Sequence, residues 1–111
     1  MEVKWYENNE HDFRNRIAGR LSELGWRVST ERPVPTGRID ILAFRDDCIA
    51  IIEVKVGSSC REIQTALGQL LWYSEFYPNA LLQLATPKKP AQEHLEFLKR
   101  HGVEYLDPHV L

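Results

Sequence analysis

The first regular hydrophobic pattern along the chain predicts a helix over residues 9–24. Phe13, Ile17, Leu21 and Leu24 recur every three or four residues, which is the spacing of one buried helical face. An asparagine, Asn8 or Asn9, precedes this run and suits the N-cap position, because its side chain can accept a hydrogen bond from the first turn. Gly25 follows the run and suits a left-handed residue that closes the helix.

The next apolar segments are rich in β-branched residues and predict three strands. Residues 26–31 alternate between apolar and polar positions, and Pro33 and Pro35 are expected to end this strand. Residues 39–44 and 48–56 predict a β-hairpin that turns through Arg45-Asp46-Asp47. One face of the hairpin carries Ile39, Ile41, Ile52 and Val54, and the other carries Leu42, Phe44, Ile49 and Ile51. Strands that are apolar on both faces are typical of a sheet covered on both sides.

The second half of the chain predicts alternating helices and strands. Ser59 and Glu62 form a capping-box pattern that begins a helix, which must end near Tyr77, before Pro78. Residues 80–86 predict a strand parallel to the hairpin, since a helix lies between them. A third helix is expected from Pro90 to Gly102, followed by a strand over residues 103–106. The fold class is therefore α/β, a single domain over residues 1–111 with a mixed sheet flanked by helices.

Three charged residues interrupt the otherwise apolar hairpin. With a two-residue turn at Asp46-Asp47, residues pair when their numbers add up to 93, so Asp40 lies opposite Glu53. Lys55 points to the same face as Glu53, because residues two apart on a strand share a face. The two carboxylates repel one another, and either Lys55 or a divalent cation would offset that repulsion. A salt bridge among solvated strand-end charges is the simpler alternative.

This hairpin resembles the signature of the PD-(D/E)xK nuclease superfamily. The matching residues are Arg38-Ile39-Asp40 and, after twelve residues, Glu53-Val54-Lys55. The restriction-endonuclease-like core of that superfamily has the order αβββαβ, which is the order predicted for residues 9–86. The chain departs from the family pattern at the proline, where Arg38 or Ile39 stands, but that position binds no metal in the family.

The resemblance implies a metal-dependent nuclease that hydrolyses DNA phosphodiester bonds. Asp40, Glu53 and the backbone carbonyl of Val54 would bind Mg²⁺, for which Mn²⁺ would substitute, and Lys55 would assist the attacking water. An acid of the first helix often completes the metal site in the family, and Glu10 fits that place, with Glu7 as a competitor. A first-turn acid that only complements the helix dipole is the alternative.

The second helix carries a further resemblance. Gln69 and Tyr73 are four residues apart and resemble the QxxxY motif of exonuclease-type members, in which the glutamine helps to position substrate. Gln64 fits this role less well, and ordinary packing beside Trp72 is the alternative for Tyr73.

Charge and composition limit the possible partners. The 111 residues carry 14 basic and 16 acidic side chains, a net charge of −2, which argues against a polybasic nucleic-acid tail. Candidate DNA contacts are the cations nearest the predicted site, which are Arg38, Arg61, Lys88 and Lys89. Four histidines and two cysteines show no zinc spacing. No signal peptide or membrane span is evident, so a cytoplasmic, non-membrane protein is expected.

Two classes of function are consistent with this pattern. The first is a nuclease that acts as a homodimer, because one active site cuts one strand. Trp5, Trp72 and Phe76 could contribute to a dimer interface, although packing in the core is the expected role for them. The second is a noncatalytic DNA-binding or protein-interaction subunit with the same fold, and a protein partner could supply specificity in either case. Hydrolysis of RNA is a third, less favoured reading.

Overall fold

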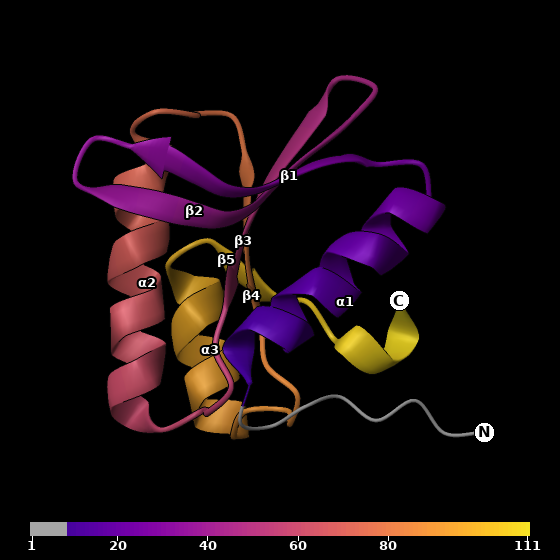
Figure 1. Ribbon diagram of the computed structural model, residues 1–111. Coiled ribbons are helices and arrows are strands. Elements are labelled where there is room, and N and C mark those ends of the chain that lie inside the picture. Colours follow the sequence, from indigo (N-terminus) through magenta and orange to yellow (C-terminus); the bar gives the residue numbers. More distant parts are fainter. Residues whose placement is uncertain (1–8) are drawn as a thin grey trace.

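The computed structural model describes residues 9–111, which form a five-stranded mixed sheet between two helical layers (Figure 1). The elements follow in the order α1 (Glu10–Glu23), β1 (Arg27–Val34), β2 (Gly37–Arg45), β3 (Cys48–Val54), α2 (Cys60–Ser74), β4 (Leu81–Ala85), α3 (Gln92–Arg100), β5 (Val103–Tyr105) and the 3₁₀ helix η1 (Pro108–Val110). The predicted order of helices and strands is therefore confirmed, with η1 as an addition that the sequence did not indicate.

The sheet has the strand order β1-β2-β3-β4-β5. The first three strands are antiparallel neighbours, whereas β4 is parallel to β3 and β5 is parallel to β4. The α/β fold class with a mixed sheet is thus confirmed. The parallel crossovers follow from the helices α2 and α3, which carry the chain back before each new strand begins.

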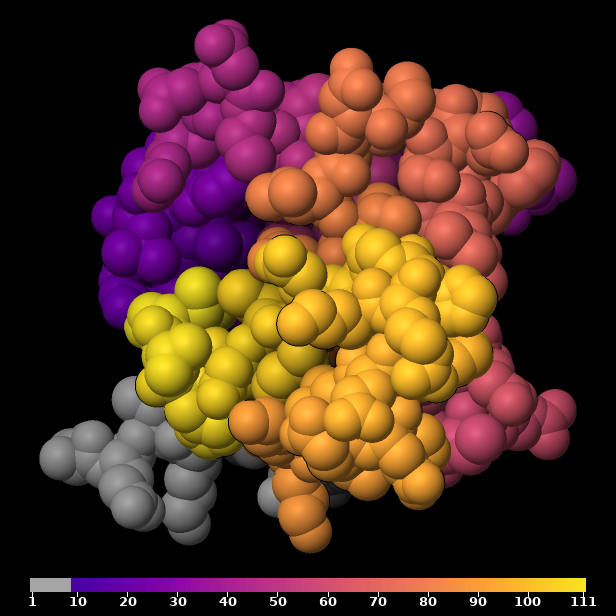
Figure 2. All heavy atoms as spheres, turned by 180° about the vertical axis from the view of Figure 1, so that it is seen from behind, coloured from indigo at the N-terminus to yellow at the C-terminus, as the bar shows by residue number. Residues whose placement is uncertain are grey.

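Helices cover both faces of the sheet. On one face, α1 packs through Phe13, Ile17 and Leu21 against Ile41 and Ile52. On the other face, α2 and α3 form a larger core that includes Ile51, Leu70, Leu84 and Leu98. Figure 2 shows the opposite side of the molecule, where the C-terminal segment lies against α1, and the Arg20 guanidinium donates to the carbonyl oxygen of Leu111 from Nε, at 3.0 Å, and from Nη2, at 2.6 Å.

The predicted helix caps are present at α1 and α2. Asn9 is the N-cap of α1 and accepts a hydrogen bond from the Asp12 backbone at 3.1 Å, which decides between the two asparagines. Gly25 follows that helix with a φ of 95°, the left-handed conformation expected of it. Ser59 caps α2 and accepts from the Glu62 backbone at 3.3 Å.

Several predicted boundaries were wrong. β1 runs on through Pro33 to Val34, because it is an edge strand on which a missing N–H costs no sheet hydrogen bond. β3 ends at Val54 rather than at residue 56, and α2 ends at Ser74 rather than near Tyr77. α3 begins at Gln92, two residues after Pro90.

The placement of Ile39 on the same hairpin face as Ile41, Ile52 and Val54 was also wrong. Ile39 packs in the core beneath α2, whereas Ile41 packs beneath α1. Residues two apart on a regular strand share a face, so the alternation breaks between them. At that point Asp40 has no partner in β1, and Glu31, which would pair with it, takes a φ of 52°.

Candidate metal centre and adjoining groove

The hairpin of β2 and β3 has the predicted register. Ile41 pairs with Ile52 and Arg45 with Cys48, so paired residue numbers add up to 93 across a two-residue turn. Asp46 occupies the first turn position with a φ of 54°, which a short aspartate side chain tolerates without glycine. Asp40 lies one residue beyond the last ladder pair, and the Val54 backbone N–H donates to its Oδ2 at 2.8 Å. Asp40 and Glu53 therefore meet where the ladder ends.

Glu53 is the most deeply buried charged residue of this end of the sheet, with 2% of its surface exposed. Lys55 Nζ lies 3.5 Å from Glu53 Oε2, whereas Glu53 Oε1 is buried and has no hydrogen-bond donor within residues 9–111. The Lys55 backbone N–H donates to the Ala85 carbonyl at 3.1 Å, which extends the pairing of β3 and β4 to this residue. Lys55 is thus paired with Glu53, whereas Asp40 accepts from the Val54 backbone.

This arrangement changes the protonation of Glu53. Burial is the main cause that raises the pKa of Glu53, and the adjacent charge of Asp40 and a hydrogen bond between the two carboxyl groups add to it. Together they raise this pKa to about 9. Lys55 lowers the pKa but does not cancel these effects. Without a metal, Glu53 therefore holds a proton at neutral pH.

Glu10 lies in the first turn of α1, on the surface but within electrostatic range of Asp40 and Lys55. Partial loss of hydration raises the pKa of Glu10, and the charge of Asp40 adds to this effect, while Lys55 and Arg14 oppose it. Glu7, the alternative candidate, lies outside the described residues. The structure thus brings Glu10 toward Asp40 and Lys55.

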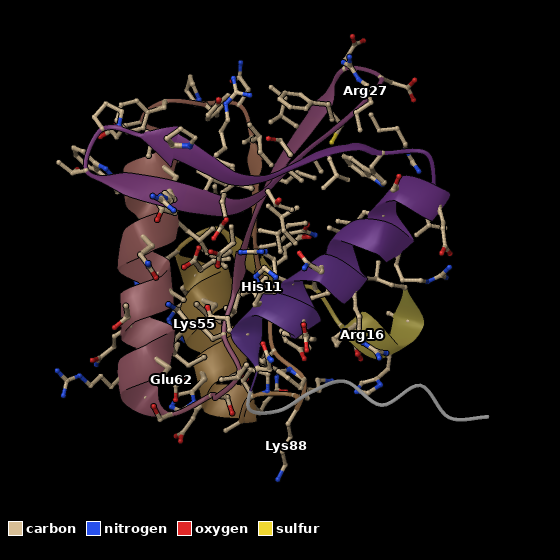
Figure 3. All side chains as sticks on the ribbon, in the orientation of Figure 1. His11, Arg16, Arg27, Lys55, Glu62 and Lys88 are labelled. Atoms are coloured by element: carbon tan, nitrogen blue, oxygen red, sulfur yellow. The ribbon has the colours of Figure 1, made fainter. Side chains whose placement is uncertain are left out.

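Two residues near Glu10 were not predicted to belong to this region. Glu62, recognised in the sequence only as part of a cap, also raises the pKa of Glu10, and Figure 3 shows it with Lys55 between α2 and the first turn of α1. Arg14 is buried beside Glu10 on α1 and forms an ion pair with Glu31, at 3.0 Å between Nη1 and Oε1. The only sequence signal for Arg14 is its position four residues after Glu10, one helical turn away.

Gln69 and Tyr73 lie on the face of α2 that points toward the same end of the hairpin. Tyr73 is 3% exposed. Burial and the charges of Glu53 and Asp40 raise the pKa of the Tyr73 hydroxyl, while hydrogen bonds with the Arg38 backbone and the Gln69 side chain lower it. The Gln69 Oε1 atom is buried and has no partner in the described part of the chain. Gln64 is exposed.

The predicted DNA-contacting cations are dispersed. Arg38 is exposed at the start of β2, Arg61 is exposed in the first turn of α2, and Lys88 and Lys89 are exposed after β4. Figure 3 shows Lys88 pointing away from the molecule and from Lys55. Of these four, only Arg38 lies on the same strand as Asp40, two residues before it on β2.

The donors at the end of the hairpin suit a magnesium-type cation. The carboxyl groups of Asp40 and Glu53 are hard oxygen ligands, and one Glu53 oxygen is buried without a donor in the described part of the chain. Within residues 9–111, no three His, Cys, Asp or Glu side chains are close enough together to hold a metal by themselves. Mg²⁺ is commonly held by one or two carboxylates with water completing its shell, so the Asp40–Glu53 pair fits this cation.

In the described part of the chain, no helix has the length and apolar character needed to cross a membrane.

Comparison with solved structures supports the fold. EndoMS, in a structure of its complex with double-stranded DNA, is 18% identical and superimposes with a TM-score of 0.72 over 96% of this chain and 46% of its own. The crystal structure of AF1548, a protein of unknown function, is 19% identical, with a TM-score of 0.75 over 89% of this chain and 58% of its own. The chain thus spans about half the length of these proteins and shares their restriction-endonuclease-like fold.

The sequence comparison identifies the family. No curated protein sequence is similar enough to count as a match. The family model described as the nuclease-related domain matches residues 7–110, which is nearly the whole chain and includes Asp40, Glu53 and Lys55. The chain therefore belongs to the nuclease-related domain family.

Proposed function

We propose that this protein is a metal-dependent nuclease that hydrolyses phosphodiester bonds in DNA. The observation that carries the proposal is the buried Glu53 carboxyl group beside Asp40, with one oxygen lacking a donor and the other 3.5 Å from the Lys55 ammonium. Two adjacent ionised carboxylates are costly in a sheet unless a proton or a cation offsets their repulsion, and a bound cation would replace the proton that Glu53 holds in its absence. Membership of the nuclease-related domain family and the DNA complex of EndoMS support the same reading.

In this proposal Asp40, Glu53 and the Val54 carbonyl hold Mg²⁺ or Mn²⁺, and Glu10 stands beside them. The cation would neutralise the phosphodiester and lower the pKa of water. Lys55 would place its ammonium group beside the attacking water, and its charge would offset the negative charge that develops on the phosphate. Gln69 and Tyr73 line the approach to this centre and would orient the substrate strand.

The proposed partners of this protein follow from the same chemistry. DNA is the proposed substrate. A homodimer would place two centres on two strands, which is the symmetric arrangement required to cut both. A separate protein could supply specificity, since none of the described elements forms a helix-turn-helix or other base-reading module. A cytoplasmic location accords with these substrates.

The test is incubation with single-stranded, duplex, nicked and four-way-junction DNA in Mg²⁺ or Mn²⁺. We expect wild type to cleave at least one substrate, and Lys55→Ala and Asp40→Asn to lose at least 100-fold in rate, the usual scale for an electrostatic group in an active site. Lys99→Ala, which removes an exposed lysine on α3, is the matched control and should retain full activity.

Equal background cleavage by wild type and Lys55→Ala would rule out catalysis at this centre. If Mg²⁺ binding were also unaffected by Asp40→Asn, the noncatalytic subunit would become the better reading.

A further inference from the structure

A groove adjoins the candidate metal centre on the side of α2. It lies between the turn that joins β1 to β2 and the middle of α2, and its volume is about 600 Å³. The residues that line it include Gly37, Arg38, Gly68, Gln69, Trp72 and Tyr73. This volume falls in the range of sites that hold a small ligand or a few groups of a larger one.

Trp72 forms a fixed aromatic surface in this groove. Its indole Nε1 donates to the Pro35 carbonyl at 3.0 Å, and the Phe76 ring packs edge-on against it at 5.5 Å between centroids. Despite both contacts, 45% of Trp72 remains exposed. Phe76 is also exposed, so the expectation that Trp72 and Phe76 pack in the core was wrong. Trp5, for which the same was expected, lies outside the described residues. A large apolar ring held in one orientation and left half-open to solvent is typical of a binding surface.

Two glycines shape the groove, one by allowing close approach of the strand and the other by leaving space on the helix. A Cβ atom at Gly37 would lie 3.2 Å from the Tyr73 ring, so the strand approaches α2 closely only because that residue has no side chain. A Cβ atom at Gly68 would meet no atom within 4 Å, although the residue lies within α2. Glycine weakens a helix by roughly 1 kcal/mol relative to alanine. The open space at Gly68 is thus maintained against helix propensity.

The groove lies next to the candidate metal centre, and Tyr73 and Arg38 connect the two. Tyr73 lines the groove, and the charges of both Glu53 and Asp40 act on its hydroxyl. Arg38 also lines the groove, and it precedes Asp40 by two residues on β2. A strand whose phosphate reached Asp40 and Glu53 would therefore extend past the Arg38 guanidinium and the Trp72 ring.

We propose that this groove holds an unpaired stretch of the DNA strand, with a base stacked on Trp72 and a phosphate contacting Arg38. The inference rests on the proposed function and assigns its substrate class. Inside a duplex both faces of each base are covered by neighbouring pairs, so a base away from the duplex ends must be unpaired to stack on the indole. Stacking on an aromatic ring tolerates any base sequence, and a cation beside it follows the backbone.

Gly68→Leu provides the sharpest test, because a Cβ atom at Gly68 meets no atom within 4 Å and the leucine side chain would project into the groove. Gly19→Leu is the matched control: Gly19 is an exposed glycine within α1 that also has no atom within 4 Å of a Cβ position. Both substitutions should raise Tm, because leucine favours helix more than glycine does. Only Gly68→Leu should weaken binding.

Binding is measured by fluorescence anisotropy of a labelled twelve-residue oligothymidylate and of its duplex with oligoadenylate, without divalent metal. We expect tighter binding of the single strand by wild type and Gly19→Leu, and at least tenfold weaker single-strand binding by Gly68→Leu and Trp72→Ala, on the scale of one lost stacking contact. Trp72→Phe should retain most of the affinity, because the phenyl ring still offers an aromatic face for stacking.

Unchanged single-strand binding in both Gly68→Leu and Trp72→Ala would overturn the inference, as would equal affinity for duplex and single strand. The proposed function is tested separately by cleavage in Mg²⁺. If Trp72→Ala and Gly68→Leu cleaved duplex DNA as fast as wild type, the protein would be a nuclease whose substrate does not pass through this groove. If the oligothymidylate bound in the groove but no DNA were cleaved, the groove inference would stand and the proposed nuclease function would be wrong.

Discussion

At the scale of single residues, the buried Glu53 carboxyl group links the candidate centre to protein stability. Its pKa of about 9 in the folded chain exceeds the ordinary glutamate value of 4.5. Below pH 4.5 both folded and unfolded chains hold the proton. Between pH 4.5 and pH 9 the unfolded chain releases it and the folded chain retains it, so the free energy of unfolding falls as pH rises.

We therefore predict that the metal-free protein becomes less stable from pH 5.5 to pH 8.5, by up to about 1.4 kcal/mol per pH unit from this residue alone. Glu53→Gln keeps the shape of the side chain without the titrating proton, and it should flatten this dependence. Urea unfolding in EDTA at pH 5.5, 7 and 8.5 measures both slopes. Glu96→Gln, at an exposed position on α3, is the control and should unfold like wild type. A slope that persisted unchanged in Glu53→Gln would contradict the assignment.

The same proton predicts how metal binding depends on pH. A cation that replaces the proton on Glu53 must release it, so apparent Mg²⁺ affinity should rise by up to about tenfold per pH unit between pH 7 and pH 9. Calorimetric titration in two buffers with different ionisation enthalpies measures the number of protons released. If almost no protons were released at pH 7.5 and the Mg²⁺ affinity did not depend on pH, Glu53 would not be a metal ligand.

At the scale of secondary-structure elements, patterning predicted most of the fold. The spacing of Phe13, Ile17 and Leu21 and the caps at Asn9 and Ser59 are local signals, and each held in the structure. The break in alternation between Ile39 and Ile41 was not predictable, because it depends on how β1 meets β2 at Glu31. Sequence propensity describes a single segment of chain, whereas this break arises from the pairing of two strands, β1 and β2.

The cap of α2 offers a prediction at this scale. Ser59 Oγ accepts from the Glu62 backbone and donates to Glu62 Oε1 at 2.9 Å, so Ser59→Ala should cost about 1 kcal/mol in stability. For a domain of this size that loss lowers Tm by roughly 4 °C or more. Ser22→Ala, near the C-terminal end of α1, is the control for loss of an exposed hydroxyl. Thermal unfolding followed by circular dichroism compares them, and equal Tm values for the two variants would show that the cap contributes nothing.

At the scale of the whole molecule, the candidate site was predictable where it lies on one hairpin and less so where it is assembled from distant segments. The register brought Asp40 and Glu53 together from sequence alone, because a two-residue turn fixes it. The approach of Glu62 to Glu10 and the groove between Pro35 and Trp72 depend on how α2 packs against the sheet. No local pattern encodes those tertiary contacts.

The balance of charge over the molecule yields a prediction about DNA affinity. The chain carries a net charge of −2, and Asp40 and Glu62 both raise the pKa of Glu10, so acids gather around the proposed metal centre. In the proposed function these acids would repel DNA until a cation binds among them. We expect weak duplex binding in EDTA and at least tenfold tighter binding in Ca²⁺, which takes the same kind of oxygen ligands.

Asp40→Asn should abolish the gain that Ca²⁺ produces. Asp46→Asn removes the same charge from the hairpin turn, about 20 Å along the strand at roughly 3.3 Å per residue, and asparagine also tolerates the left-handed conformation found there. It should therefore retain the Ca²⁺ response. If both variants responded like wild type, Ca²⁺ would be acting through general screening of charge rather than through a bound ion at Asp40. If both lost the response equally, net charge rather than a site at the end of the hairpin would govern DNA binding.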